Sequence, residues 1–337
     1  MRDQIREQIR AFIQDNAPPE LLGTRKGRFD GPWGGRSASF GSDAQKRWYR
    51  ACLDAGYTAP SWPTEFGGGG LSQVQSRVFE QELVRAEMPP PLVGFGLTMI
   101  GPTLLDYGND AQKRQHIPAI VRGEIRWCQG YSEPGAGSDL ANLSARAERD
   151  GDFLVVSGRK VWTSHADKAD WIFALVRTTP RSAGLNKRTG ISFVLIDMKT
   201  AGVSVRPIKL ISGNSPFCET VFDDVRVPLS NVVGQLDDGW TIAKALLGYE
   251  RTMIGEAMGG VILGMESSLV ALARSKSALS AHKRGQIAAL SIRGVALQAT
   301  LENVVAAMQS GRAPGSEASI IKIASSELKQ RRWELAA

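Results

Sequence analysis

The stretch WIFALVRTTPRSAGLNKRTGISFVLID, residues 171–197, decides the fold of this chain. It holds two apolar runs, residues 171–176 and 191–196, which are rich in β-branched and aromatic side chains and predict strands. Further short runs of this kind, separated by Gly, Asp and Pro, lie at residues 153–156, 203–205 and 220–222. Short strands at this spacing predict a central β-barrel-like or sandwich domain, which we assign to residues 125–234.

The region before these strands, residues 1–124, has the period of helices. Its first turns repeat apolar side chains at helical spacing, at Ile5, Ile9, Phe12 and Ile13. Ser42–Asp43 has the residue types of a helix N-cap, and Ser72 opens another helix that a Pro run at 89–91 is expected to end. Residues 111–121 predict one more helix, so this region is expected to form an N-terminal helical domain.

The helical period returns in residues 235–337. Residues 239–276 predict one helix of about 38 residues, roughly 57 Å long. A second helix is expected over residues 282–309 and a third from residue 316 to the end of the sequence. The order of elements along the chain, helices first, then strands, then long helices, excludes a doubly wound α/β fold with a parallel sheet. The predicted fold class is α+β and multidomain, with a C-terminal long-helix bundle that we expect to be truncated.

Composition indicates a globular protein without a membrane span. The chain has 337 residues, of which 42% are hydrophobic and 22% charged. No apolar run approaches the roughly 18 residues that a spanning helix needs. The first residues, 1–6, lack the apolar segment of a secretory signal, and the three cysteines are far apart. We therefore expect a soluble protein in the reducing environment of the cytoplasm.

Charge and histidine content restrict the classes of ligand. The net charge of +7 has two readings, an ordinary basic surface or cations that neutralise an anionic ligand such as a nucleotide or coenzyme A. No Lys/Arg run or aromatic-basic module of a nucleic-acid-binding protein occurs. The three histidines have no metal-ligand spacing to one another or to Cys, so we expect no metal site.

Three segments could carry chemistry. Residues 127–139, WCQGYSEPGAGSD, form either an ordinary turn cluster or a loop that offers backbone N–H groups to an anion or a heteroaromatic ring. In residues 160–165, KVWTSH, Trp162 is either a core aromatic or a stacking platform for a planar ring. Glu250 lies among apolar helix residues, so it is either a solvated or salt-bridged glutamate or a desolvated base.

Together these segments resemble the acyl-CoA dehydrogenase family over nearly the whole chain. The motifs that carry the resemblance follow the family's order: Trp62–Gly68, Gly108–Lys113, Ser132–Asp139, Lys160–Ser164, Phe222–Pro228 and Asn231–Gly234. The resemblance implies an N-terminal helical domain, a central β domain and a C-terminal four-helix bundle. It also implies FAD as cofactor, an acyl-CoA substrate, and an oxidoreductase of fatty acid metabolism that works as a homodimer, homotetramer or hetero-oligomer.

The resemblance assigns the flavin site to two segments. It implies that the isoalloxazine ring is held by Gln129, Tyr131, Ser132, Ser138, Trp162, Thr163 and Ser164. In the family's pattern Ser132 and Ser164 hydrogen-bond polar edges of the ring, and Trp162 lies against it. Ser138 contacts both the cofactor and the CoA-bearing substrate, and Met99 is expected in the substrate pocket.

The family's reaction is α,β-dehydrogenation of an acyl-CoA thioester, with hydride transfer to FAD and electron-transferring flavoprotein as the usual reoxidant. A carboxylate removes the α-proton. Most members use a glutamate late in the C-terminal bundle, but the isovaleryl-CoA dehydrogenase type uses a glutamate just before an arginine on the long helix. Glu250 and Arg251 match that position, so Glu250 is the expected base and Arg251 a supporting residue.

Two departures from the family's pattern leave an alternative open. The segment that normally follows residues 318–332 and touches the FAD of a neighbouring subunit is absent, which suggests a truncated chain or a shortened gene product. The family's adenine-contacting phenylalanine is missing near residues 273–277. The alternative is a non-catalytic or half-site partner subunit of a hetero-oligomeric acyl-CoA dehydrogenase. An oxidase or monooxygenase on the same scaffold is a third possibility.

Overall fold

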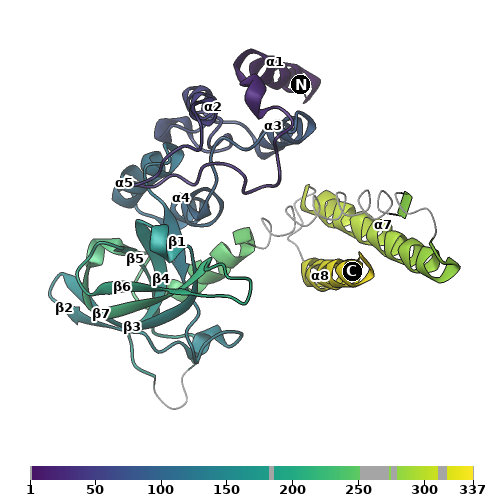
Figure 1. The fold of residues 1–337 in the computed structure, drawn as a ribbon. Coiled ribbons are helices and arrows are strands. Elements are labelled where there is room, and N and C mark those ends of the chain that lie inside the picture. Colours follow the sequence, from purple (N-terminus) through teal and green to yellow (C-terminus); the bar gives the residue numbers. More distant parts are fainter. Residues whose placement is uncertain (1, 182–185, 251–272, 275–278, 310–316, 337) are drawn as a thin grey trace. The chain divides into compact units, whose positions relative to one another are not determined.

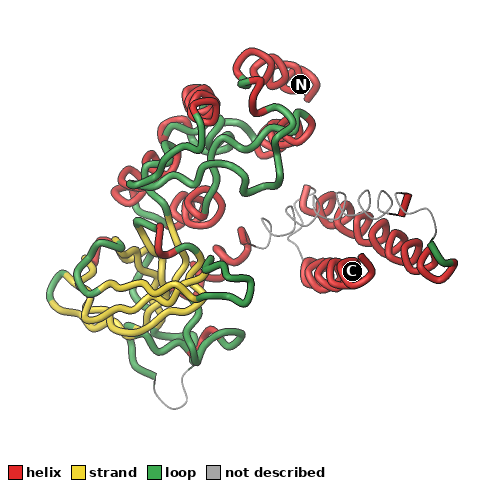
Figure 2. Tube along the Cα trace, in the orientation of Figure 1, coloured by secondary structure: helices red, strands yellow, loops and turns green. Residues whose placement is uncertain are grey.

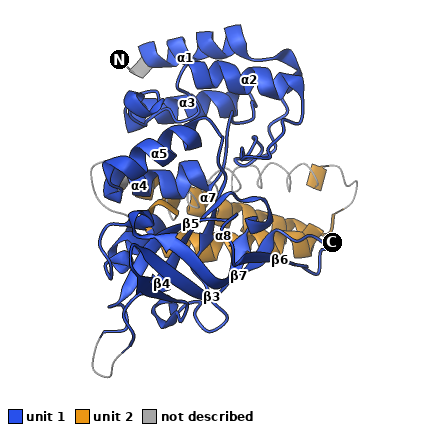
Figure 3. Cartoon of the chain, turned by 90° about the vertical axis from the view of Figure 1, so that its left-hand side faces the viewer, with its two compact units in different colours: residues 1–247 blue, residues 248–337 orange. Residues whose placement is uncertain are grey.

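The structure, a computed structural model, describes residues 2–181, 186–250, 273–274, 279–309 and 317–336. Contacts divide the chain into two compact units, Met1–Leu247 and Gly248–Ala337 (Figure 3). The first unit holds the N-terminal helices, the sheet and the helical residues 239–247. The second unit holds the helices α7 (Ala281–Gln309) and α8 (Glu317–Ala336).

Helices make up most of the N-terminal region (Figure 1). They are α1 (Arg2–Asn16), α2 (Asp43–Asp54), α3 (Gln73–Arg85), α4 (Gly101–Tyr107) and α5 (Asp110–Val121), with a π-helical turn, η3 (Gly96–Ile100), leading into α4. The predicted caps are confirmed, because Ser42 caps α2 and Ser72 forms a capping box with Gln75 at the start of α3. The face of α1 that carries Ile5 and Ile9 is buried, as its period predicts.

The expected end of α3 was wrong. The helix stops at Arg85, before the Pro run at 89–91. Ala86 closes the last turn through hydrogen bonds to the carbonyls of Glu82 and Val84, and Glu87 then takes a positive φ of 48°. A residue in this left-handed region ends a helix by itself, so the prolines only follow a turn that is already complete.

One mixed sheet forms the central region (Figure 2). Its strands are β1 (Trp127–Gly130), β2 (Arg146–Asp150), β3 (Phe153–Ser164), β4 (Trp171–Arg177), β5 (Ile191–Asp197), β6 (Val203–Ile208), β7 (Phe217–Pro228) and β8 (Val232–Val233). The strand order is β6-β7-β3-β2-β4-β5-β8, and β1 pairs in parallel with β4. All five predicted apolar runs lie in strands. Every residue of β4 is buried, which explains why its run is continuous and not alternating.

Most of the polar segment at residues 160–165 belongs to a strand. Residues 160–164 form the end of β3 and pair with β7. The pairing shifts register between Lys160 and Thr163, so Trp162 lies in a bulge. This end of the strand was not predicted, because its side chains are mostly polar and its bulge breaks the alternation of buried and exposed residues from which strands are recognised.

The helical region and the sheet share a core. Ile117 and Ile120 of α5 belong to the same buried cluster as Trp127 and Phe173 of the sheet. Gln112, buried in the first turn of α5, donates from Nε2 to the carbonyls of Ser230 and Val232 at 2.8 Å each. The motif at residues 108–113 therefore caps α5 and fastens it to the end of the sheet.

Helices return after the sheet. Residues 239–250 and 273–274 are helical, while residues 251–272 and 275–276 of the predicted first long helix lie outside the described residues. The next two helices are confirmed as α7 (Ala281–Gln309) and α8 (Glu317–Ala336). They pack through a small apolar core of Leu290, Leu297, Leu301, Ile321 and Leu328. None of the helices described here is both long and apolar enough to cross a membrane.

Candidate functional site

The two predicted flavin segments lie side by side. The backbone N–H of Val161 donates to the carbonyl of Ser132 at 2.9 Å. A second contact joins Lys160 Nζ to the carbonyl of Tyr131 at 3.4 Å. The loop that follows Ser132 begins with a tight turn, in which Glu133 and Ala136 exchange backbone hydrogen bonds of 2.9 and 3.0 Å. The two segments, about 30 positions apart in sequence, are thus hydrogen-bonded to each other.

Trp162 has the backbone geometry of a functional position. Its side chain is 56% exposed and its φ is +59°. A bulky residue in the left-handed region is strained by roughly 1–3 kcal/mol and persists only where its surroundings impose it. The surroundings that impose it are two backbone pairs between β3 and β7, Lys160 with Thr220 before the bulge and Thr163 with Cys218 after it. The arrangement presents an indole ring outward from a rigid strand and suits stacking on a planar ligand.

The glycines of the loop face open space. A Cβ added to Gly135 or Gly137 would meet no atom of the chain within 4 Å. A Cβ on Gly130, in contrast, would lie 2.7 Å from Ile172, so close packing requires that glycine. The internal packing of the chain gives no reason for the first two glycines. Bare backbone beside open space fits the close approach of a ligand such as a flavin.

Besides Trp162, four of the predicted flavin residues keep accessible side chains. Gln129 is partly exposed on β1, where it pairs with Phe173. Ser132 and Ser164 are partly exposed at the two joined segments, and Ser138 is exposed in the loop. The polar atoms of these side chains are therefore available to hydrogen-bond a ligand.

Two predicted flavin residues have buried side chains. The Tyr131 ring is 5% exposed and meets Phe173 and Phe193 edge to face, at centroid distances of 6.1 and 6.3 Å. The Thr163 side chain is fully buried. Because the whole residue is 0% exposed, the predicted contact of Thr163 with a cofactor stays a prediction.

Met99 lies in the π-helical turn η3 and is 2% exposed within the core that holds Trp127 and Tyr131. A partly open crevice lies nearby, lined by residues 92–97 and Arg126 but not by Met99. π-Helical turns occur frequently at functional sites. The predicted contact of Met99 with substrate stays a prediction.

Glu250 is partly buried and is the last described residue of the helix over 239–250. It belongs to the second compact unit, whereas the flavin segments belong to the first. Arg251 lies outside the described residues. The roles of both residues therefore stay predictions.

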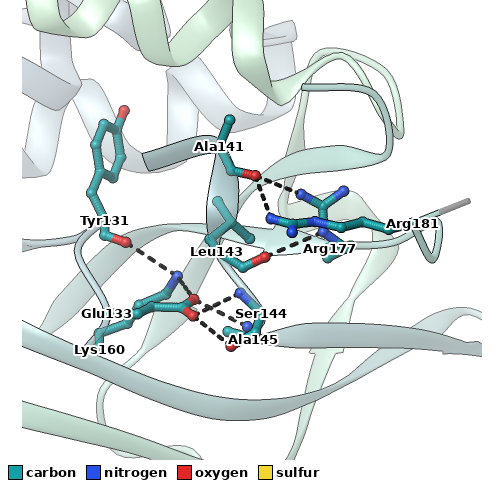
Figure 4. Close-up of polar contacts among 9 residues, drawn as sticks. All are labelled: Tyr131, Glu133, Ala141, Leu143, Ser144, Ala145, Lys160, Arg177 and Arg181. Atoms are coloured by element: carbon teal, nitrogen blue, oxygen red, sulfur yellow. Dashed lines mark hydrogen bonds and ion pairs between the residues drawn. The ribbon is translucent and has the colours of Figure 1, made fainter. Parts of the chain in front are cut away.

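A buried ion pair escaped the sequence analysis (Figure 4). Lys160 Nζ lies 2.7 Å from Glu133 Oε1, with Lys160 fully buried and Glu133 5% exposed. The Glu133 carboxylate also accepts from Ser144 N, Ser144 Oγ and Ala145 N at 2.7, 2.8 and 3.0 Å. Burial raises the pKa of Glu133, but the Lys160 ammonium and these donors outweigh it and bring the pKa below its ordinary value.

A signal for this pair was present in the sequence. Lys160 follows Leu154 and Val156 at even spacing on β3, which places it on the inward face of the strand. A lysine at an inward position needs an acidic partner, because lysine is almost never fully buried without one. The partner itself could not be identified, since several acidic residues were available and the pairing of segments was unknown.

A second buried cation holds the far end of the loop. Arg177 donates from Nε to the carbonyl of Leu143 at 3.3 Å and from Nη2 to the carbonyl of Ala141 at 3.0 Å. Arg181 donates to the Ala141 carbonyl as well, at 2.8 Å (Figure 4). Burial lowers the pKa of Arg177, with the charge of Arg181 as a further cause. The loop is thus fixed at both ends by charged side chains.

Comparison with known proteins gives family matches along almost the whole chain. The acyl-CoA dehydrogenase N-terminal domain matches residues 2–124, the middle domain residues 128–225 and the C-terminal domain residues 237–337. Acyl-CoA dehydrogenase IpdE1 of Mycobacterium tuberculosis (strain ATCC 25618 / H37Rv) is 40% identical over 276 residues, which cover 82% of this chain and 70% of that protein. The chain spans less than two thirds of the length of four other curated relatives.

Solved structures share the fold. The Tcur3481-Tcur3483 steroid ACAD is 30% identical with a TM-score of 0.77, over 99% of this chain and 83% of that one. The ChsE4-ChsE5 complex from Mycobacterium tuberculosis is 29% identical with a TM-score of 0.72, over the same shares of the two chains. These likenesses extend through the sheet and the helices on both sides of it.

Proposed function

The chain belongs to the acyl-CoA dehydrogenase family, and from this premise we propose that it is an FAD-dependent enzyme that introduces an α,β double bond into an acyl-CoA thioester. The observation that supports the proposal best is the hydrogen bond between Val161 and Ser132, which joins the two flavin segments beside the exposed Trp162. The family implies FAD, which when bound supplies a planar acceptor for hydride. The open backbone at Gly135 and Gly137 fits such a ring.

The proposal gives each flavin residue a position. Ser132, Ser164 and Gln129 hydrogen-bond polar edges of the ring, and Trp162 lies against its face. Ser138 contacts both the cofactor and the CoA moiety. Tyr131 contributes the rigidity of its buried ring, Thr163 is the proposed cofactor contact between Trp162 and Ser164, and Met99 is the proposed residue of the substrate pocket.

Glu250 is the proposed base, with Arg251 in support. The α C–H of a thioester is weakly acidic, so the base must be desolvated and close to the proton. The apolar neighbours Leu246 and Leu247, of which Leu246 is fully buried, make such an environment at the end of the described helix.

Electron-transferring flavoprotein is the proposed reoxidant, and the cytoplasm the proposed compartment. The three-part division at residues 1–124, 125–234 and 235–337 is likewise a proposal.

Glu250→Gln tests the catalytic assignment. We expect this variant to lose at least about 100-fold in turnover, because general-base catalysis contributes that much or more, while it keeps its flavin. Turnover is measured with an artificial electron acceptor over a panel of acyl-CoA thioesters, and flavin content by visible absorbance. Since one similar structure is a steroid ACAD, the panel includes a steroid side-chain thioester. Glu327→Gln, at an exposed position of α8, is the matched control. Full turnover in Glu250→Gln with flavin bound would remove Glu250 from the mechanism.

A partner-subunit role is the second candidate. Two observations favour it: the likeness to the ChsE4-ChsE5 complex, and large apolar side chains of α7 and α8 that are more than half exposed. These are Ile292, Val295, Ile320, Ile323 and Trp333. Apolar surface of this kind is typical of protein interfaces. The proposed partner is another acyl-CoA dehydrogenase chain.

Light scattering and absorbance of the chain purified alone distinguish the two candidates. A colourless chain that takes up flavin only with a second dehydrogenase chain supports the partner-subunit role. A yellow homo-oligomer with turnover rules that role out.

A further inference from the structure

We propose that the buried Glu133–Lys160 ion pair is a positioning device for the cofactor, which holds the two flavin segments in the geometry that binds the ring. The inference rests on the proposed function and adds two positioning residues to it. Glu133 directly follows Ser132, and Lys160 precedes Trp162 by two positions. The pair therefore bridges the two segments at the point where each turns toward the open space.

The fold by itself gives little reason for an ion pair at this position. Both side chains are buried, and the cost of removing two charges from water is comparable to their mutual attraction. Apolar residues of similar volume often serve folding equally well or better. What an ion pair adds is directionality, because its hydrogen bonds fix angles as well as distances.

Glu133 fixes the shape of the loop. One oxygen, Oε2, accepts from the backbone and the hydroxyl of Ser144, and the other, Oε1, accepts from Ala145 N and from Lys160. A single carboxylate thus closes the loop across residues 133–145. Gly135 and Gly137 are exposed between these ends, so the closure helps to hold them, together with the hydrogen bond from Asn142 Nδ2 to the Gly135 carbonyl at 3.0 Å.

Lys160 fixes the bulge. It is the last residue in register with β7 before the shift that ends at Thr163, and its ammonium is anchored in the interior. A register slip by one residue would turn Lys160 outward and leave the buried Glu133 carboxylate without its cationic partner, with only the donors of Ser144 and Ala145. The pair therefore fixes the position of the bulge, and with it the outward direction of Trp162.

The experiment uses three variants of the full chain: Glu133→Gln, Lys160→Met and the double variant. FAD affinity is measured by fluorescence titration of the flavin-free protein, the flavin environment by the visible spectrum, and folding by urea unfolding of the apoprotein. Each single variant is expected to lower apoprotein stability and FAD affinity together. The double variant is expected to regain most of the apoprotein stability, because no unpaired charge is left buried. Its FAD affinity is still expected to be lower by a factor of roughly ten or more, because the directional contacts that position the two segments are gone.

Arg159→Met is the matched control. Arg159 is the neighbour of Lys160 on β3 and pairs with Glu219 at 3.2 Å on the exposed face. It is expected to keep wild-type FAD affinity and spectrum. Ser144→Ala is the milder variant, for use if the stronger variants fail to fold. Ser144 is exposed, and the substitution removes a single hydroxyl that donates to Glu133. It is expected to weaken FAD binding severalfold.

The outcomes separate the two proposals. A double variant, or a Ser144→Ala variant, that binds FAD with wild-type affinity and spectrum would reduce the pair to a structural element and overturn the inference. A wild-type chain that binds FAD in no condition, with or without a partner chain, would instead refute the proposed function.

Discussion

Trp162 combines a large exposed ring with a backbone conformation that side chains of its size avoid. Its φ of +59° costs roughly 1–3 kcal/mol. Within the part of the chain that the structure describes, its ring meets a single aromatic side chain, Phe217, edge to face at 5.9 Å. A residue that contributes strain and little packing is retained for a reason other than stability. Stacking on a ligand is such a reason.

The pair Trp162→Gly and Trp127→Ala tests this view. Trp162→Gly relieves the strain, so we expect the unfolding free energy of the apoprotein to change by less than about 1 kcal/mol or to rise. Trp127 is 1% exposed, and its replacement by alanine should cost about 3–5 kcal/mol. FAD affinity should fall in Trp162→Gly. Urea unfolding and FAD titration measure the two effects, and equal stability losses in both variants would contradict the interpretation.

At the level of single residues, sequence reasoning selected several residues that the structure leaves exposed and passed over the buried ion pair beside them. Ser132, Ser138 and Trp162 keep exposed atoms at the joined segments, as their residue types suggest. Glu133 and Lys160 belong to the same two motifs, but sequence reasoning gave neither of them a role of its own. Their role depends on a contact across 27 positions, and no local pattern encodes it.

The helical region meets the sheet where α5 packs on β1 and β4. His116 of α5 lies edge to face with Trp127 of β1 and Trp171 of β4, at ring distances of 5.2 and 4.8 Å. It is 1% exposed, and its Nε2 has no hydrogen-bond partner among the residues that the structure describes. Burial lowers the pKa of His116 to about 4. The junction is therefore built around a neutral imidazole.

This geometry predicts a pH-dependent stability. Above pH 6.5 the histidine is neutral in both the folded and the unfolded chain and contributes no pH dependence. Between pH 6.5 and 4 the unfolded chain takes up a proton that the folded chain does not. The unfolding free energy therefore falls as the pH falls, by about 1.4 kcal/mol per pH unit and about 3 kcal/mol in all.

The measurement is urea unfolding at several pH values for the wild type and for His116→Phe, which keeps an aromatic ring between the two tryptophans. The variant should lose this part of the pH dependence. His282→Phe, at an exposed position of α7, is the control and should behave as the wild type. Parallel pH curves for the wild type and His116→Phe would show that the histidine is not held neutral.

Among elements, those with strong local signals were predicted well. α2 and α3 begin at the serines that cap them, and β4 and β5 follow the apolar runs within one residue. β2, RAERD, was missed because it buries a single residue and has no apolar period. The end of β3 was missed because its bulge breaks the alternation. Both failures occur where pairing with neighbouring strands, and not local sequence, imposes the strand.

For the whole molecule, the change of period along the sequence was enough to predict the order of helices, sheet and helices. The way the N-terminal helices and the sheet share one core was not predictable, because it depends on contacts such as those from Gln112 to the carbonyls of Ser230 and Val232. These contacts make residues 1–247 one compact unit and hold the joined segments on a rigid base.

The central claim is that residues 129–139 and 160–165 together hold the flavin ring. Hydrogen exchange of the backbone amides, compared between the flavin-free and the FAD-saturated chain, tests it most directly. The account predicts slower exchange in peptides covering residues 133–139 and 161–165 on FAD binding, with little change in α1 at the far end of the helical region. Saturation with FAD that slows exchange elsewhere and leaves both of these segments unchanged would contradict it.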